Sequence, residues 1–245
     1  MEINHPALEQ IPSLRQLWKE AFGDSDAFLD QFYRTAFAPE RCVCATEGCT
    51  LVAAAYWFSC GEYAYIYAVA TAKKYQGRGI CHALMGKIHE ILTLRGYDGC
   101  ILVPGAESLR RFYRGMGYEN FGGVYSLICE AGAPLPLRRI SADEFAALRR
   151  QYLPEGGVIQ EGENLAFLSC WAEFYAGPDA LVTAVREDGK VRILELLGST
   201  DAAPGIAASL GAKSASIRTP GSIPYAMYKP LNKKQAPKYF GFCFD

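Results

Sequence analysis

The sequence predicts an α/β protein, with a mixed, mostly antiparallel central sheet flanked by helices and followed by a second, smaller α/β domain of similar plan. Three observations support this class. Strand-like apolar runs, among them TLVAAAYWFSC at residues 50–60, alternate with helical apolar stripes. Two glycines join one such strand to an amphipathic helix. The segment EAGAPLPL at residues 130–137 has two prolines and little that could pack, which is typical of a linker.

The first domain opens with two predicted amphipathic helices. Their apolar stripes lie on either side of the polar break GDSD and consist of Leu8, Ile11, Leu14, Leu17 and Trp18, and of Phe28, Phe32, Tyr33 and Phe37. Three strand-like runs follow, RCVCAT, TLVAAAYWFSC and YAYIYAVAT, with turn residues between them. Such neighbours predict an antiparallel meander.

A further helix is predicted to start at Ile80, because apolar residues recur with helical spacing until Gly96 supplies a left-handed C-cap. A short strand, GCILV, comes next, then a helix around Tyr113, then strand-like segments that end near Cys129. With the boundary placed in the linker, the first domain covers residues 1–133.

The second domain, residues 134–245, is predicted to repeat this plan loosely. Helices are expected at residues 142–150, 165–175 and 206–210. Strands are expected at ALVTAV, VRILELL, SASIR, YAMYKPL and YFGFCF. Where the first domain has its glycine pair, the second has LGSTDAAPG, with an acidic Asp201 and no basic residue. We therefore expect only the first domain to keep an anion-binding loop.

The amino-acid composition disfavours several classes of binding partner. The 25 Lys and Arg residues against 26 Asp and Glu give a formal charge of -1, which disfavours nucleic acid and anionic membranes. The longest apolar run is far shorter than the about 20 residues that span a bilayer. The N-terminus lacks a basic region followed by an apolar core. Nine cysteines without framework spacing indicate reduced thiols and no zinc site, so we expect a cytoplasmic protein that holds no metal.

The segment YQGRGICHAL, residues 75–84, places glycines where a helix begins. A helix N-terminus offers unpaired backbone N–H groups and a partial positive charge, and glycines let a bulky anion approach them. A pyrophosphate fits this description. The spacing matches neither the dinucleotide-binding fingerprint nor the nucleotide P-loop.

The run Gln76-Gly77-Arg78-Gly79-Ile80-Cys81 resembles the acetyl-CoA loop of the GNAT superfamily of N-acetyltransferases, in which Cys81 replaces the usual final Gly or Ala. The preceding AVATAKKYQ resembles the strand that hydrogen-bonds the pantetheine arm in that family. For about residues 1–130, the resemblance implies the acyl-CoA N-acyltransferase fold, with acetyl-CoA as co-substrate. The residues it assigns to the coenzyme are Val69, Ala70, Thr71, Gln76, Gly77, Arg78, Gly79, Ile80 and Cys81.

Tyr113 lies in LRRFYRGMGY, which is similar to the family's second recurring segment. There a tyrosine protonates the departing thiolate, so the resemblance implies that Tyr113 is the general acid. The alternative is a core role, because Tyr113 shares an apolar helix face with Leu109, Phe112 and Met116. The asparagine that often begins this segment is absent.

The base that accepts the proton of the attacking amine is left open between Glu62, Asp245 and water. Glu62 stands at a strand start, where an exposed turn carboxylate is the alternative interpretation. Asp245 enters through resemblance to the enhanced-intracellular-survival type of acetyltransferase, where the terminal carboxylate serves the active site. His82 and His89 are predicted to lie on a solvated helix face and to bind no metal.

These observations predict an N-acetyltransferase that acts on a primary amine of a small molecule or peptide. The amine would attack directly and form a tetrahedral intermediate, with an oxyanion donor near Val69–Thr71. The second domain is expected to shape the acceptor pocket. The alternative is a non-catalytic acyl-CoA-binding sensor or interaction module. The identity of the acceptor and the choice between monomer and homodimer stay open.

Overall fold

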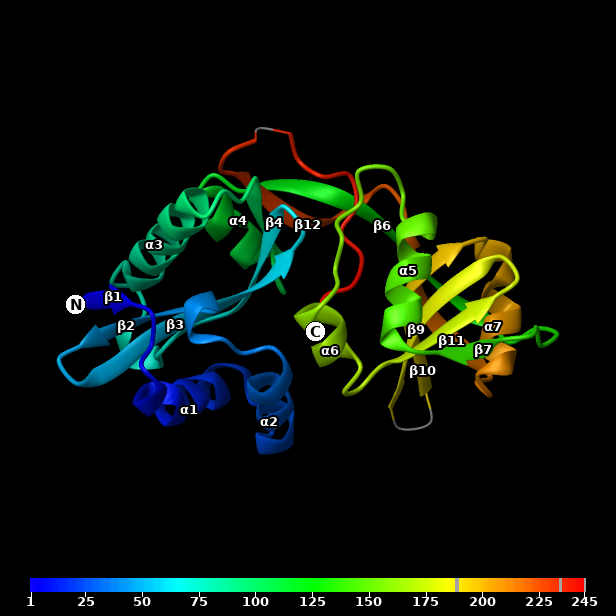
Figure 1. The fold of residues 1–245 in the computed structure, drawn as a ribbon, viewed down its shortest axis with the longest axis horizontal. Coiled ribbons are helices and arrows are strands. Elements are labelled where there is room, and N and C mark those ends of the chain that lie inside the picture. The colour runs from blue at the N-terminus through cyan, green and yellow to red at the C-terminus, as the bar shows by residue number, and fades with distance from the viewer. Residues whose placement is uncertain (188–189, 234, 245) are drawn as a thin grey trace. The chain divides into compact units, whose positions relative to one another are not determined.

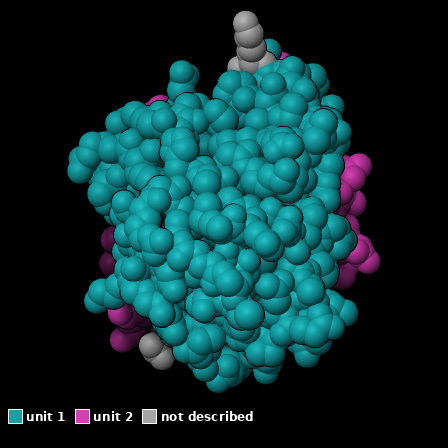
Figure 2. Space-filling model, turned by 90° about the vertical axis from the view of Figure 1, so that its left-hand side faces the viewer, with its two compact units in different colours: residues 1–119, 227–236 teal, residues 120–226, 237–245 magenta. Residues whose placement is uncertain are grey.

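The computed structural model describes residues 1–187, 190–233 and 235–244. Two compact units are found, unit 1 with residues 1–119 and 227–236, and unit 2 with residues 120–226 and 237–245. Figure 2 colours them separately. Whereas the sequence places one boundary at 133/134, the units divide at 119/120, and each also takes a segment from the last 20 residues of the chain. In the described part of the chain, no helix has the length and apolar character needed to cross a membrane.

Unit 1 is built mainly from the first 119 residues. Its helices and strands are β1 (Glu2–Asn4), α1 (Ile11–Phe22), α2 (Asp26–Thr35), β2 (Cys42–Glu47), β3 (Thr50–Cys60), β4 (Tyr63–Thr71), α3 (Ile80–Leu94), β5 (Gly99–Leu102) and α4 (Glu107–Arg114). The second half of β12 (Ile223–Pro230) completes the unit. The short strand β1 is the element that the sequence did not predict here, because its three residues are too few to show a period.

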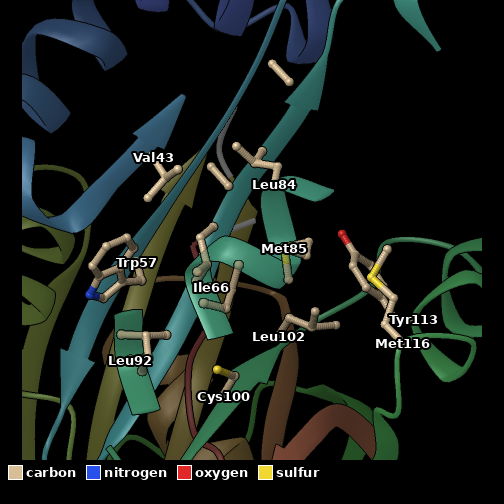
Figure 3. Packing of buried hydrophobic residues seen from close by; sticks show 14 of the residues in the cluster. Val43, Trp57, Ile66, Leu84, Met85, Leu92, Cys100, Leu102, Tyr113 and Met116 are labelled. Atoms are coloured by element: carbon tan, nitrogen blue, oxygen red, sulfur yellow. The ribbon is translucent and has the colours of Figure 1, made fainter. Parts of the chain in front are cut away.

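The sheet of unit 1 is a meander that ends in a parallel pair. Strands β1 to β4 run antiparallel in sequence order, β5 pairs parallel to β4, and β12 pairs antiparallel to β5. Helix α3 covers one face of the sheet, and α1 and α2 cover the other (Figure 1). Beneath α3, Leu84 and Leu92 are fully buried and pack with Val43, Trp57 and Ile66 of the strands (Figure 3). This core fixes the end of α3 at which the glycine pair lies.

Unit 2 has the same strand order and directions. Its elements are β6 (Glu119–Glu130), β7 (Arg138–Ile140), α5 (Ala142–Tyr152), α6 (Glu163–Leu168), β8 (Glu173–Gly177), β9 (Ala180–Glu187), β10 (Lys190–Gly198), α7 (Ala203–Ser209) and β11 (Ser214–Pro220). Strands β7 to β10 form an antiparallel meander, β11 pairs parallel to β10, and β6 pairs antiparallel to β11. The strand sequence of unit 1 is thus repeated in unit 2.

The last strand of each sheet comes from an unexpected part of the chain. Strand β6 follows α4 in the sequence, yet it pairs with β11, with Ser214 opposite Glu130. Strand β12 follows β11, yet its second half pairs with β5, with Met227 opposite Leu102. The two units have therefore exchanged their final strands, and the linker at residues 130–137 follows β6 within unit 2.

Two elements predicted for the second domain are wrong. The helix expected at residues 165–175 ends at Leu168, and Phe174 lies in β8, where its ring stacks on Phe145 at 4.4 Å. The segment YFGFCF forms no strand in its described residues and makes only an isolated bridge between Tyr239 and Gly157. Its aromatic side chains are buried, so core burial and not sheet pairing explains its apolar pattern.

A buried ion pair lies under this C-terminal segment within unit 2. Arg149 donates from Nε to Glu195 Oε2 at 2.7 Å and from Nη2 to Oε1 at 2.9 Å, with side chains only 3% and 1% exposed. Tyr239 donates its hydroxyl to Glu195 Oε1 at 3.0 Å, and Gln160 Nε2 donates to the Phe242 carbonyl at 2.7 Å. These polar groups hold residues 239–242 against α5 and β10.

Candidate active site

A β-bulge interrupts β4 near its end. Opposite β3, Tyr67 pairs with Tyr56 and Ala70 pairs with Ala54, so two residues of β4 face the single residue between Ala54 and Tyr56. Ala68 sits in the bulge with φ of +48°, a left-handed conformation that an alanine seldom adopts. Bulges bend a strand and raise its twist. The bulge therefore turns the end of β4 away from a regular sheet path.

The parallel strands β4 and β5 separate before the bulge. Their register runs from Tyr63 opposite Gly99 to Tyr65 opposite Ile101 and goes no further in the described residues. The edge of β4 from Ile66 to Thr71 is thus open on its β5 side, and an extended ligand with amide groups can hydrogen-bond to such an edge. Of the residues predicted to bind pantetheine, Val69 and Thr71 are half-buried and Ala70 is buried at this edge.

The glycine pair forms the turn between β4 and α3. Gly77 and Gly79 have φ of +74° and +76°, and no heavy atom lies within 4 Å of the position that a Cβ would take at either residue. Gly79 is the N-cap of α3, and no side chain caps the helix. The first N–H groups of a helix have no acceptor within it, so Ile80 and Cys81 present theirs beside open space. This geometry suits a bound anion.

Side chains hold the glycine turn in place and give it positive charge. Gln76 Nε2 donates to the Thr71 carbonyl at 3.1 Å, which ties the loop back to the end of β4. Arg78 donates to Glu47 at 2.7 Å and lies over the Tyr75 ring at 5.2 Å. The neighbouring Lys73 and Lys74 add two exposed cations. The turn thus combines oriented N–H groups with an excess of positive charge.

Tyr113 reaches the start of α3 from α4. It is 8% exposed and belongs to the same buried cluster as Met85 and Met116, with its hydroxyl directed toward Met85 (Figure 3). Burial, and then the nearby Cys81 thiol, raise the pKa of Tyr113 well above its ordinary value. The phenol is therefore protonated at neutral pH, as a proton donor must be. Leu109 and Phe112 are more than 40% exposed, so the apolar face predicted for this helix is only half buried.

Cys81 lies in the first turn of α3 and is half-buried. Burial raises the pKa of its thiol to about 11, which keeps it protonated and poorly nucleophilic at neutral pH. Cys81 packs against the buried cluster that contains Tyr113, and its thiol contributes to the raised pKa of Tyr113.

A small apolar hollow, here called the α1 hollow, lies on the α1 side of the bulge. It is a shallow depression with no interior space for a water-sized molecule, and its walls are Leu14, Leu17, Trp18, Phe22, Ala54, Tyr56, Ala68 and Ala70. Phe22 is 47% exposed at the rim, whereas Leu14 and Trp18 are buried. Trp18 Nε1 donates to Asp24 at 2.7 Å. The sequence indicates these helix residues only as core, because no periodicity separates a pocket wall from a core face.

The structure does not bring Glu62 to this site. Glu62 precedes β4, six residues before Ala68, and a strand of that length spans about 20 Å. Its carboxylate is exposed and pairs with Lys233 at 3.4 Å. Asp245 lies outside the described residues. Glu62 is therefore too far from the bulge to act there as the base, and its alternative interpretation as an exposed turn carboxylate fits the structure.

One histidine prediction is wrong. His82 is exposed as expected, but His89 is half-buried, and a 2.8 Å hydrogen bond joins its Nε2 to the hydroxyl of Tyr118. Burial, with Lys229 and His82 nearby, lowers the pKa of His89 to about 4. Among the described residues, no group of three or more His, Cys, Asp or Glu side chains is placed to hold a metal ion.

Comparison with known proteins links this geometry to a family. Residues 2–121 match the family model described as "Acetyltransferase (GNAT) domain". No curated protein sequence matches the chain. Among solved structures, a GCN5-related N-acetyltransferase from Kribbella flavida has a TM-score of 0.72 at 20% identity, covering 94% of this chain and 71% of its own. One from Anabaena variabilis has a TM-score of 0.71 at 16% identity over 94% and 73%.

Eis1 from Mycobacterium abscessus is also similar, with a TM-score of 0.69 at 14% identity, covering 95% of this chain and 74% of that protein. At these identities the likeness is one of fold. It extends over both units, whereas the family model covers unit 1 up to the start of β6.

Proposed function

Residues 2–121 belong to the GNAT family of acetyltransferases, and on this premise we propose that the protein is an N-acetyltransferase that moves an acetyl group from acetyl-CoA to a primary amine. The observation that carries the proposal is the open edge of β4, which is followed, after a short 3-10 helix at Lys73–Tyr75, by the uncapped N-terminus of α3. A pantetheine arm can pair with the edge of β4 while the pyrophosphate sits at Gly77–Cys81.

The proposed chemistry assigns the proton donor to Tyr113. The neutral amine nitrogen attacks the thioester carbonyl carbon and gives a tetrahedral intermediate, whose oxyanion is met by a backbone N–H near the bulge. Collapse breaks the C–S bond, and Tyr113 gives its proton to the departing thiolate. The amine loses its own proton to water or to a base. No covalent enzyme intermediate is needed, and Cys81 is kept protonated by burial.

The proposed function is tested by thiol release from acetyl-CoA with a panel of amines. We expect at least one amine to raise thiol release and to appear as its N-acetyl product by mass spectrometry. If coenzyme A binds but no amine raises thiol release, the protein is instead an acyl-CoA-binding module. If coenzyme A does not bind, both functions are wrong.

Gly79→Val is expected to weaken coenzyme A binding by roughly 10- to 100-fold. The side chain strains a residue whose φ is +76° and displaces N–H groups of the kind worth about 1.5–3 kcal/mol to a charged partner. Isothermal titration with coenzyme A measures the effect. The matched control is Gly86→Ala, in the exposed middle of α3 with nothing within 4 Å of its Cβ position. We expect unchanged affinity and a gain in stability of up to about 1 kcal/mol.

The acceptor is proposed to enter from the α1 side. The α1 hollow adjoins the bulge through Ala68 and Ala70, and its walls are almost entirely apolar. Because the hollow has no interior space of its own, the acceptor is proposed to contact its rim, where an amine carried on a short alkyl or aromatic group suits the apolar surface better than a polyhydroxylated one.

Phe22→Ala is expected to raise KM for such an amine by about fivefold and to leave KM for acetyl-CoA unchanged, because part of an aromatic contact at the rim is lost. Steady-state kinetics with both substrates varied provides the measurement. Leu8→Ala is the control, since Leu8 is 65% exposed and lies outside the hollow. Equal effects of the two substitutions would contradict this placement of the acceptor.

Unit 2 is proposed to be a degenerate copy of unit 1. The equal order and directions of their strands support this. The turn after β10 carries Asp201 where unit 1 has its basic glycine turn, which disfavours a second coenzyme site. Nine free cysteines favour a reducing compartment such as the cytoplasm.

A further inference from the structure

One face of α3 runs along the end of α4. Cys81, Met85 and His89 are spaced by four residues and therefore share this face. Tyr113 packs at the second turn, in the same buried cluster as Met85, with its hydroxyl directed toward that residue (Figure 3). Tyr118 meets the third turn at His89. Two tyrosines thus lie along the same helix that presents the glycine turn.

Tyr118 is held from several sides. Its side chain is 1% exposed, and a 2.8 Å hydrogen bond joins its hydroxyl to His89 Nε2. Burial and the nearby Cys100 thiol, on β5, raise the pKa of this hydroxyl. A neutral imidazole can accept the phenolic proton. The hydrogen bond ties Tyr118 to α3, and the buried cluster packs it with Cys100 of β5.

Tyr118 in turn restrains Tyr113. The two rings lie 5.7 Å apart at 65°, an edge-to-face contact. The main chain adds two bonds, since the Tyr113 carbonyl accepts from the N–H of Tyr118 at 3.1 Å and of Met116 at 2.9 Å. Lys229 donates to the Met116 carbonyl at 2.8 Å. His89 is thus connected to Tyr113 through Tyr118, by one hydrogen bond and one ring contact.

We propose that His89 and Tyr118 are a positioning pair that holds the Tyr113 hydroxyl against α3 at Met85. Neither residue touches the reacting atoms. Their effect is geometric, because a general acid loses efficiency steeply when it is displaced from its proton acceptor. This inference rests on the proposed function, in which Tyr113 is the acid.

Kinetics of three variants test the pair. His89→Leu removes the hydrogen bond, and we expect kcat for thiol release to fall about tenfold while KM for acetyl-CoA stays within about twofold. His89→Gln restores a polar group near the Nε2 position and is expected to recover kcat to within about threefold. His82→Gln, an exposed site on the same helix, is the control and should match the native chain. In a Tyr113→Phe background, His89→Leu should cause no further loss, because the residue it positions is absent.

A spectroscopic readout makes the test independent of turnover. In protein labelled with ¹³C at tyrosine Cζ, the Tyr113 resonance is assigned by its loss in Tyr113→Phe. We expect it to shift in His89→Leu, to return in His89→Gln and to stay in place in His82→Gln.

The outcomes separate the two proposals. If no amine is acetylated by the native chain but the resonance shifts as described, the positioning pair holds and the proposed function is wrong. If the resonance stays in place in His89→Leu, or if kcat falls further when His89→Leu is added to Tyr113→Phe, the positioning role is overturned.

Discussion

Replacing Tyr113 by Phe is expected to lower kcat by about two to four orders of magnitude, the range typical of a lost general acid. KM for acetyl-CoA should change little, because the ring that packs with Met85 and Met116 is kept. Since burial and Cys81 raise the pKa of Tyr113, the native phenol stays protonated through the alkaline range in which amines become neutral. The native rate is therefore expected to rise with pH up to about 10 without a decline caused by this group.

The measurement is thiol release under saturating acetyl-CoA from pH 6 to 10. Tyr97→Phe serves as the matched control, because Tyr97 loses only a 2.8 Å hydrogen bond to Ser59 on the same unit and lies away from the glycine turn. If Tyr113→Phe is as fast as the native chain, the general acid is another group. The proposed acetyl transfer is not contradicted by that result.

Glu195→Gln is expected to lower the free energy of unfolding by about 3–5 kcal/mol. The substitution keeps the shape of the side chain but leaves the Arg149 guanidinium, 3% exposed, without its counter-charge. Tyr239 also loses a charged acceptor for its hydroxyl, so the hold on residues 239–242 is weakened. Urea denaturation followed by fluorescence provides the measurement.

The control for this effect is the double variant Arg149→Met with Glu195→Leu. Removing both charges avoids the buried uncompensated ion, so the double variant should lie within about 2 kcal/mol of the native protein. If it is as unstable as Glu195→Gln, the loss comes from packing and not from the unpaired charge.

Periodicity predicted most of unit 1 because its elements are long and regular. The helix from Ile80 begins at the predicted residue, and the three central strands match their predicted runs. In unit 2 the spacing of apolar residues does not separate helix from strand. A short buried helix and a strand follow one another there in a single apolar stretch around Leu168 and Phe174. Because apolar residues run through both elements, the change from helical to strand spacing cannot be seen in the sequence.

The candidate site was predictable only where backbone conformation dictates the residue. Gly77 and Gly79 are required by their positive φ values, so the turn is visible in the sequence. The bulge at Ala68 cannot be predicted from the sequence, because alanine is not a residue type that favours a positive φ. His89 also escaped prediction, because a histidine opposite the apolar stripe of its helix became half-buried through a tyrosine from a later segment.

The exchange of β6 and β12 has a consequence for how the protein is made. The chain leaves the ribosome from its N-terminus, so α1 to α4 are synthesised first, yet β5 gains its partner β12 only after residue 230 has emerged. A nascent unit 1 thus carries an unpaired strand edge throughout the synthesis of unit 2, a template for wrong pairing. A cut at the linker would give two incomplete sheets instead of two domains, so unit 1, which carries the glycine turn, depends for its last strand on a segment made after residues 120–226 of unit 2.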